Sequence, residues 1–243
     1  MFRFNEEIGR YVLKGSERWQ SDLVRWDISP HIISIGIITV FLLILFVIIN
    51  LKIKKADPLE KPKGILFLTE MFVTMIDNFT VGMVGDKLKS LSPYIGFLAI
   101  YLLLANTIGL LGFTPPTSSI SVTFTFGLTT FLLIRFYGIK LKGRAHFTDM
   151  MRPILLAPIN IIGELALPIS LSVRIFGNIL SGLVVMTLIY TSMGLLSPYI
   201  ELLTGVTFLV PLLHIYFDLF AGAIQTLVFI LLSTVYLSNA VLD

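Results

Sequence analysis

The sequence predicts an all-α, multi-pass membrane protein, and three observations support that prediction. The 243 residues are 56 % hydrophobic and only 14 % charged, whereas an ordinary soluble domain is about 25 % charged. Several uncharged apolar runs are long enough to cross roughly 30 Å of hydrocarbon as helices. Basic residues gather at alternate ends of these runs. We expect one membrane domain over residues 1–243 rather than several folded units.

Composition also limits the chemistry that the chain can perform. There is no cysteine, which excludes disulfides, thiolate metal sites and cysteine nucleophiles. Neither a GxxxxGKS/T phosphate loop nor an HExxH zinc motif occurs, so we expect no metal and no cofactor. The net charge of +3 is spread over the loops, which is typical of membrane topology rather than nucleic-acid binding. Membrane lipid is therefore an expected partner, and nucleic acid is not.

The first membrane span is predicted after a polar N-terminal segment, residues 1–31, in which acidic and basic side chains balance. Ile32 to Leu51 is uncharged and apolar and has the length of a membrane-spanning helix. Five lysines follow it directly: Lys52, Lys54, Lys55, Lys61 and Lys63. The positive-inside rule places these lysines in the cytoplasm and the N-terminal segment outside.

Three more helices are predicted before the chain reaches its second basic loop. Ile65 to Gly85 is less apolar, and its Glu70 and Asp77 lie seven residues apart on one helical face, which indicates an amphipathic helix at the membrane surface or dipping into it. Pro93–Phe113 and Ser119–Tyr137 are two further spans, joined by an uncharged turn that we expect to lie outside. The next cytoplasmic loop is marked by Arg135, Lys140, Lys142, Arg144 and Arg152.

The last two apolar stretches, Ile154–Thr191 and Leu202–Leu242, are too long for ordinary spans. Each would reach roughly 60 Å as a straight helix, about twice the hydrocarbon thickness. Each could be a pair of short spans broken at Pro168 or Pro211, or one long inclined helix. Proline does not decide between these arrangements, because membrane helices tolerate it.

Arg174 is the most informative residue because it lies inside an apolar run. A buried guanidinium costs from about 2.5 to more than 10 kcal/mol without a partner or water. Glu164 is ten residues away on the same predicted helix, too far for a direct pair. Arg174 could form a structural salt bridge with Asp218 of the neighbouring segment, or its partner carboxylate could lie on another protein. We favour the second interpretation, because intramembrane charges are functional by default.

A polar stripe marks the last segment. Asp218 and Gln225 are seven residues apart, two helical turns on one face, and His214 lies one turn before Asp218. The stripe could line a hydrated path, or it could form interhelical hydrogen bonds. We favour the path for Asp218 and the hydrogen bond for His214, and both interpretations stay open for Gln225. Glu164 is interpreted as an ion relay near the cytoplasmic side.

Four segments carry a resemblance to a known family. The run from Pro168 to Asn178, PISLSVRIFGN, resembles the signature of the F-type ATP synthase a subunit. The segment Asn106–Gly109, the Pro-Pro-Thr turn ending at Thr117 and the run Ile224–Ser238 are also similar to this family. The resemblance covers nearly all of the chain from the first span onwards.

The resemblance implies a non-catalytic, ion-conducting subunit of the membrane sector, with the ATP chemistry on other subunits. Its partners would be a ring of c subunits, the b-subunit peripheral stalk and the rest of the F1Fo complex. The location would be the cell (inner) membrane, with the N-terminus outside and the C-terminus in the cytoplasm. Residues 154–242 would then form a long tilted hairpin facing the rotor ring.

The resemblance also assigns residues. Arg174 corresponds to the essential arginine that faces the rotor carboxylates, and Gln225 to the polar residue packed close to it. Asn178 and Asp218 correspond to positions that line the ion path from the outside. Many bacterial members carry a glutamate where this chain has Leu183, so we expect Asp218 to serve that role alone. The sequence leaves open whether the ion is H⁺ or Na⁺.

Two other functions are the alternatives. A secondary ion-coupled transporter would need a central site between broken helices and usually an internal repeat, and neither is evident in the sequence. An intramembrane enzyme would need a nucleophile with its base, or a set of metal ligands, within the spans. The sequence offers no convincing set of either kind.

Overall fold

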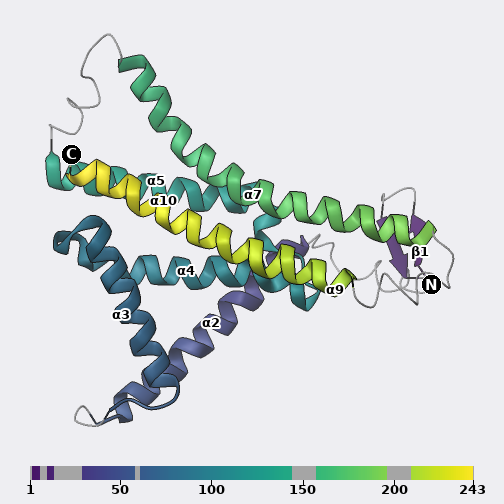
Figure 1. The fold of residues 1–243 in the computed structure, drawn as a ribbon, viewed down its shortest axis with the longest axis horizontal. Helices are drawn as coiled ribbons and strands as arrows, with labels where there is room; N and C mark the ends of the chain where they lie inside the picture. Colours follow the sequence, from purple (N-terminus) through teal and green to yellow (C-terminus); the bar gives the residue numbers. More distant parts are fainter. Residues whose placement is uncertain are drawn as a thin grey trace, which may run out of the picture.

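The computed structural model of the chain describes residues 2–5, 10–13, 29–57, 61–143, 157–195 and 209–242 (Figure 1). Within these ranges, six helices are long and apolar enough to cross a membrane. The prediction of an all-α, multi-pass membrane protein is confirmed. The structure adds a short antiparallel hairpin of β1 (Phe2–Asn5) and β2 (Arg10–Leu13) that the sequence interpretation did not include. Apolar and polar residues alternate in β1, the two-residue period of a strand, whereas β2 is apolar after Arg10.

Helix α2 (Pro30–Lys55) is the first predicted span. It begins with a proline at its first turn and carries Lys52, Lys54 and Lys55 in its last turn, where cations are favourable beside the helix carboxyl end. Its buried residues form one stripe, Ser34, Ile38 and Leu42, while most of its large apolar side chains are exposed. A helix with this surface needs a lipid environment.

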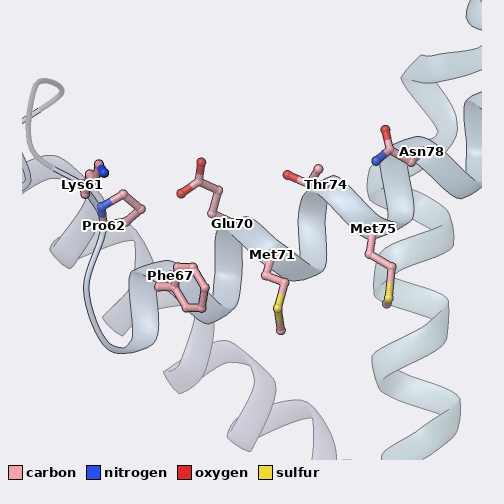
Figure 2. A pocket seen from close by; sticks show the side chains of 8 residues that line it. All are labelled: Lys61, Pro62, Phe67, Glu70, Met71, Thr74, Met75 and Asn78. Atoms are coloured by element: carbon pink, nitrogen blue, oxygen red, sulfur yellow. The ribbon is translucent and has the colours of Figure 1, made fainter.

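Helix α3 (Ile65–Val84) lies between two glycines with positive φ, Gly64 and Gly85, which let the chain turn at both ends. Figure 1 shows α2 and α3 meeting as a V, with α3 crossing the direction of α4 steeply. Figure 2 shows Glu70, Thr74 and Asn78 on one side of α3. Phe67, Met71 and Met75 lie on its other side (Figure 2). Glu70 and Asp77, which were predicted to share one polar face, line two different grooves of α3, and the helix also has the length and composition of a span. Its position at the membrane surface stays a prediction.

Helix α4, in the middle of the chain, is the most buried of the membrane-length helices in the described residues. After the 3-10 turn η1 (Asp86–Leu91), helix α4 (Ser92–Thr107) continues into η2 (Ile108–Leu111). The short turn η3 (Pro116–Ser118) then leads into α5 (Ile120–Lys142). Leu102 of α4 packs in one cluster with Ile175 and Phe229 from the two long C-terminal segments. Helix α4 is thus the support against which those segments are placed.

The two long apolar stretches are single helical segments in the described residues. Helix α7 (Ala157–Leu195) runs 39 residues without a break through Pro168. The second segment comprises α9 (Leu209–His214), the π-helical turn η6 (Ile215–Ala221) and α10 (Gly222–Leu242). The single-helix alternative is therefore correct at Pro168, whereas Pro211 lies at the start of α9, next to residues outside the described ranges. The inclination of both helices stays a prediction. The predicted beginnings of both stretches, 154–156 and 202–208, lie outside the described residues.

Close contact between α5 and α7 surrounds Pro168. Ser172 Oγ donates a hydrogen bond to the Pro168 carbonyl at 2.5 Å. A Cβ placed on Gly127 of α5 would come within 2.6 Å of the same carbonyl oxygen. The absence of a side chain at Gly127 therefore lets the two helices touch at the point where proline interrupts the α7 hydrogen-bond ladder.

Candidate functional site

Residues from three separate parts of the chain enclose a cavity of about 250 Å³ between η2, α7 and η6. Small residues and a few polar groups predominate at the points where the segments approach one another. The lining residues are Gly109, Gly112, Phe113, Thr114, Pro115, Asn178, Ile179, Gly182, Leu183, Met186, His214, Phe217 and Asp218. The cavity therefore brings the predicted residues Asn178, His214 and Asp218 together, and Leu183 lies in the same wall.

Asp218 is held in the middle of the π-helical turn η6. Its Oδ2 lies 2.7 Å from His214 Nδ1, and its side chain is 20 % exposed. Opposite it, a Cβ on Gly109 would lie 3.3 Å from both Cγ and Oδ2 of the carboxyl group. Glycine at this position therefore leaves room for the carboxyl group against η2. π-Helical turns occur frequently at functional sites.

A hydrogen-bonded chain joins Asp218 to helix α7. Tyr190 Oη lies 2.8 Å from His214 Nε2, while His214 Nδ1 faces Asp218. With an ionised Asp218 accepting from Nδ1–H, a neutral imidazole keeps Nε2 as the acceptor for the tyrosine hydroxyl. The interhelical hydrogen bond predicted for His214 is thus present, and it also places the imidazole beside Asp218. Tyr190 was missed, because a tyrosine in an apolar run gives no sign of a partner 24 residues away.

Two asparagine amides hold the junction between η6 and α10. Asn178 Nδ2 donates to the Ala221 carbonyl at 3.3 Å. Asn106 Nδ2, from α4, donates to the Gly222 carbonyl at 3.3 Å and to Thr226 Oγ1 at 3.1 Å. Asn106 is 1 % exposed. It occurs in the family-like segment, but the sequence did not indicate its structural role. The two amides fix both α4 and α7 to the end of the π turn.

Arg174 has a different environment. It lies on α7 one turn before Asn178, and its side chain is exposed on the helix surface. Within the described ranges no hydrogen bond or ion pair is found for it, and Asp218 is bonded to His214 instead. Arg174 and Asp218 therefore do not form the salt bridge that was the alternative interpretation. The guanidinium is available to a partner beyond the described part of the chain.

Gln225 is one of the few buried polar residues of α10. It is 7 % exposed, and its Nε2 has no hydrogen-bond partner in the described part of the chain. No hydrogen bond joins it to Arg174 among those residues. The predicted closeness of Gln225 to the arginine stays a prediction.

Glu164 lies at the opposite end of the site, where it has a direct partner. Arg135 Nη1 on α5 lies 2.7 Å from Glu164 Oε1 on α7, and these side chains are 18 % and 26 % exposed. The Arg135 guanidinium also lies 5.3 Å from the centre of the Phe131 ring, within reach of a cation–π interaction. The pair links α5 to α7. The sequence placed Arg135 in a loop, but α5 continues to Lys142.

Fold and site together define a class: a multi-pass helical membrane protein with a small carboxylate-bearing cavity and an arginine exposed on a long apolar helix. Comparison with known proteins narrows that class. The family model described as "ATP synthase A chain" matches residues 32–238. The chain belongs to this family. The match begins at the first predicted span and ends one turn before the end of α10.

Curated relatives agree with the family model. The chain is 34 % identical to ATP synthase subunit a of Mycoplasma pneumoniae over 241 residues, covering 87 % of this chain and 82 % of the relative. It is 31 % identical to the protein of the same name from Mycoplasmoides gallisepticum, covering 88 % and 78 %. That of Syntrophobacter fumaroxidans is 29 % identical, covering 97 % and 93 %. The similarity thus spans most of both chains in each comparison.

Proposed function

We propose that this chain is the stationary ion-translocating subunit of a rotary F-type ATP synthase, with Arg174 as the gate between two half-channels. The observation that carries the proposal is the contrast between two charges on neighbouring elements. Asp218 is bonded to His214 inside the cavity, whereas Arg174 is exposed with no partner among the described residues. Family membership supports a rotor carboxylate as that missing partner.

The chemistry of arginine suits a fixed gate. Its guanidinium stays protonated in proteins, so it does not relay a proton itself. A carboxylate brought beside it has its pKa lowered by about 1–3 units and therefore releases its proton. The same positive charge repels a free cation and prevents direct passage between the half-channels. Each ion must then travel on the rotor before it leaves.

The cavity serves as the access path to the rotor from the outside. Tyr190, His214 and Asp218 form a hydrogen-bonded chain along its wall. Leu183, the position where many family members carry glutamate, lines the same cavity as Asp218. This shared location supports the interpretation that Asp218 supplies the carboxylate from η6 that those members supply from α7.

The remaining roles follow from this mechanism. Each unit charge that crosses 100 mV supplies about 2.3 kcal/mol, which biases rotation of a ring of c subunits. The b-subunit stalk holds this chain still against the rotating ring, and ATP chemistry takes place on other subunits. We place the chain in the cell (inner) membrane, with its N-terminus outside and its C-terminus in the cytoplasm, on the basis of the lysine distribution.

Reconstituted vesicles that contain the whole complex test the gate. Arg174→Ala should assemble, lose ion-driven ATP synthesis and show a passive ion leak. Arg174→Lys should also be poor, because an ammonium lacks the planar fork and loses its proton when desolvated.

The double variant Arg174→Ala with Asp218→Asn separates gate from structure. A structural pair would tolerate removal of both charges, since no unpaired charge remains. A gate would not, because the fixed positive charge is gone. Near-normal coupled synthesis in Arg174→Ala or in the double variant would falsify the proposal.

A further inference from the structure

A second and larger cavity lies between α2, α3 and α4, away from the candidate site. Its volume is about 530 Å³, within the range of roughly 300–1,000 Å³ found for small-molecule sites. Its walls are almost wholly apolar, with contributions such as Ile49 from α2, Phe72 and Val73 from α3, and Phe97 from α4. In a membrane protein a cavity of this composition is suited to hydrocarbon rather than water.

Positive charge lies directly beyond one end of this cavity. Leu45 and Ile49 of α2 line the cavity. Lys52 lies three residues after Ile49, on the same side of the helix. Lys54 and Lys55 complete the last turn of α2 and are exposed. At the start of α3, Ile65 also lines the cavity, and Lys63, two residues before it, is exposed. The end of α2 and the segment before α3 therefore place lysines at one opening of the apolar cavity.

The acidic group in the cavity wall does not oppose an anion at that mouth. Asp77 lies twelve residues further along α3 than Ile65, which is about 18 Å at the helical rise. Its Oδ2 is also 3.7 Å from Lys89 Nζ, so its charge has a partner. Asp77 and the lysine mouth thus lie at separate ends of the cavity.

We propose that this cavity is a binding site for an anionic phospholipid. One acyl chain would occupy the apolar space between α2, α3 and α4, and the phosphate would lie among Lys52, Lys54, Lys55 and Lys63. Basic residues beside a membrane helix attract anionic lipid headgroups. An apolar cavity with a cationic mouth is complementary to both the acyl chain and the phosphate of such a lipid, which favours a phospholipid over an apolar partner helix.

The opposite face of α3 provides a matched control surface. It carries an open groove of about 730 Å³ whose lining mixes Glu70, Thr74 and Asn78 with Phe67, Met71 and Met75 (Figure 2). Val73 in the proposed site is 50 % exposed, and Met75 in this second groove is 58 % exposed. Tryptophan at either position adds a similar bulk to α3, but only Val73→Trp fills the proposed site.

The test uses the assembled complex in phosphatidylcholine vesicles that contain a photoactivatable phosphatidylglycerol or a phosphatidylcholine with the same reactive acyl chain. Adducts are mapped by mass spectrometry. We expect several-fold more labelling of the α2–α3–α4 cavity by phosphatidylglycerol than by phosphatidylcholine. Val73→Trp should reduce that labelling several-fold, and Met75→Trp should leave it unchanged.

Charge is tested separately from shape. The pair Lys52→Gln and Lys63→Gln should bring the two lipids to equal labelling, whereas Lys140→Gln with Lys142→Gln, at the end of α5, should preserve the preference. This lysine test stands even if Val73→Trp prevents assembly, which co-purification of the other subunits reports. Equal labelling by both lipids in the unaltered protein would overturn the proposal. So would capture of another subunit by a photo-crosslinking residue at Val73.

Discussion

The site cavity and the proposed lipid cavity lie against the same helix–turn unit, α4 with η2, yet they are built differently. The smaller one, beside η2, is lined by Asn178, His214 and Asp218, each of which has a hydrogen-bond partner. The amide bonds the Ala221 carbonyl, and the imidazole contacts both Asp218 and Tyr190. The larger one, beside α4, has an almost wholly apolar wall and side chains that are mostly half-exposed or exposed. The first holds individual groups in fixed positions, and the second provides only shape and charge. Substitutions should therefore be tolerated unequally in the two regions.

The largest difference is expected for Asp218. Among the described residues that line the small cavity, Asp218 alone carries a carboxyl group. In Asp218→Asn, ion-driven ATP synthesis by the reconstituted complex should therefore fall strongly while assembly is retained. Adding Leu183→Glu should restore part of the rate, because both positions line the same wall. Normal synthesis by Asp218→Asn alone would remove this residue from the mechanism.

The second-largest difference is expected for glycine-to-alanine substitutions in the two regions. A Cβ on Gly222 would lie 3.0 Å from Asn106 Cβ, so Gly222→Ala should lower both the synthesis rate and the thermal stability of the complex. The control is Gly36→Ala in α2, where nothing lies within 4 Å. Alanine there should be neutral or stabilising by up to about 1 kcal/mol, because glycine is the poorer helix former. Equal loss in both variants would contradict the comparison.

The ion pair at the other end of α7 should show a moderate effect. Glu164→Gln removes the carboxylate that lies beside Arg135 and should destabilise the complex by roughly 1.5–3 kcal/mol, the usual range for a hydrogen bond to a charged group. The double variant with Arg135→Gln should regain part of this stability, since a neutral pair then replaces the broken ion pair. Thermal unfolding measures the stability, and synthesis by the double variant tests whether Glu164 is also an ion relay.

Single-cysteine substitutions for topology labelling should have the smallest effect on the protein. The chain has no cysteine, so single cysteines report the side of the membrane. Thr117, in the turn that is predicted to lie outside, is fully buried, whereas Leu111 in η2 is 75 % exposed and is the better position. Leu111→Cys should react with an impermeant reagent only from outside, and Lys54→Cys only from the cytoplasm. The reverse pattern would invert the proposed orientation.

Sequence patterns predicted the helices better than the contacts between them. Apolar runs and flanking lysines located the described spans, because those features reflect the bilayer directly. The pairs Arg135–Glu164 and Tyr190–His214 were missed, because they join residues 29 and 24 positions apart and depend on how helices cross. The π-helical turn was missed as well. No composition marks it, and it depends on packing against Asn106 and Asn178 from two other helices.

The π-helical turn lets the two parts of the last helical segment face different neighbours. Seven residues separate Asp218 from Gln225, and an unbroken α-helix would point them in nearly the same direction. The wider turn at Ile215–Ala221 changes the angular phase between the residues before it and those after it. Helix α10 can therefore be oriented for one neighbour while His214 and Asp218 are oriented for another. Deleting one residue within the turn would restore α-helical phase and rotate the preceding segment by about 100°.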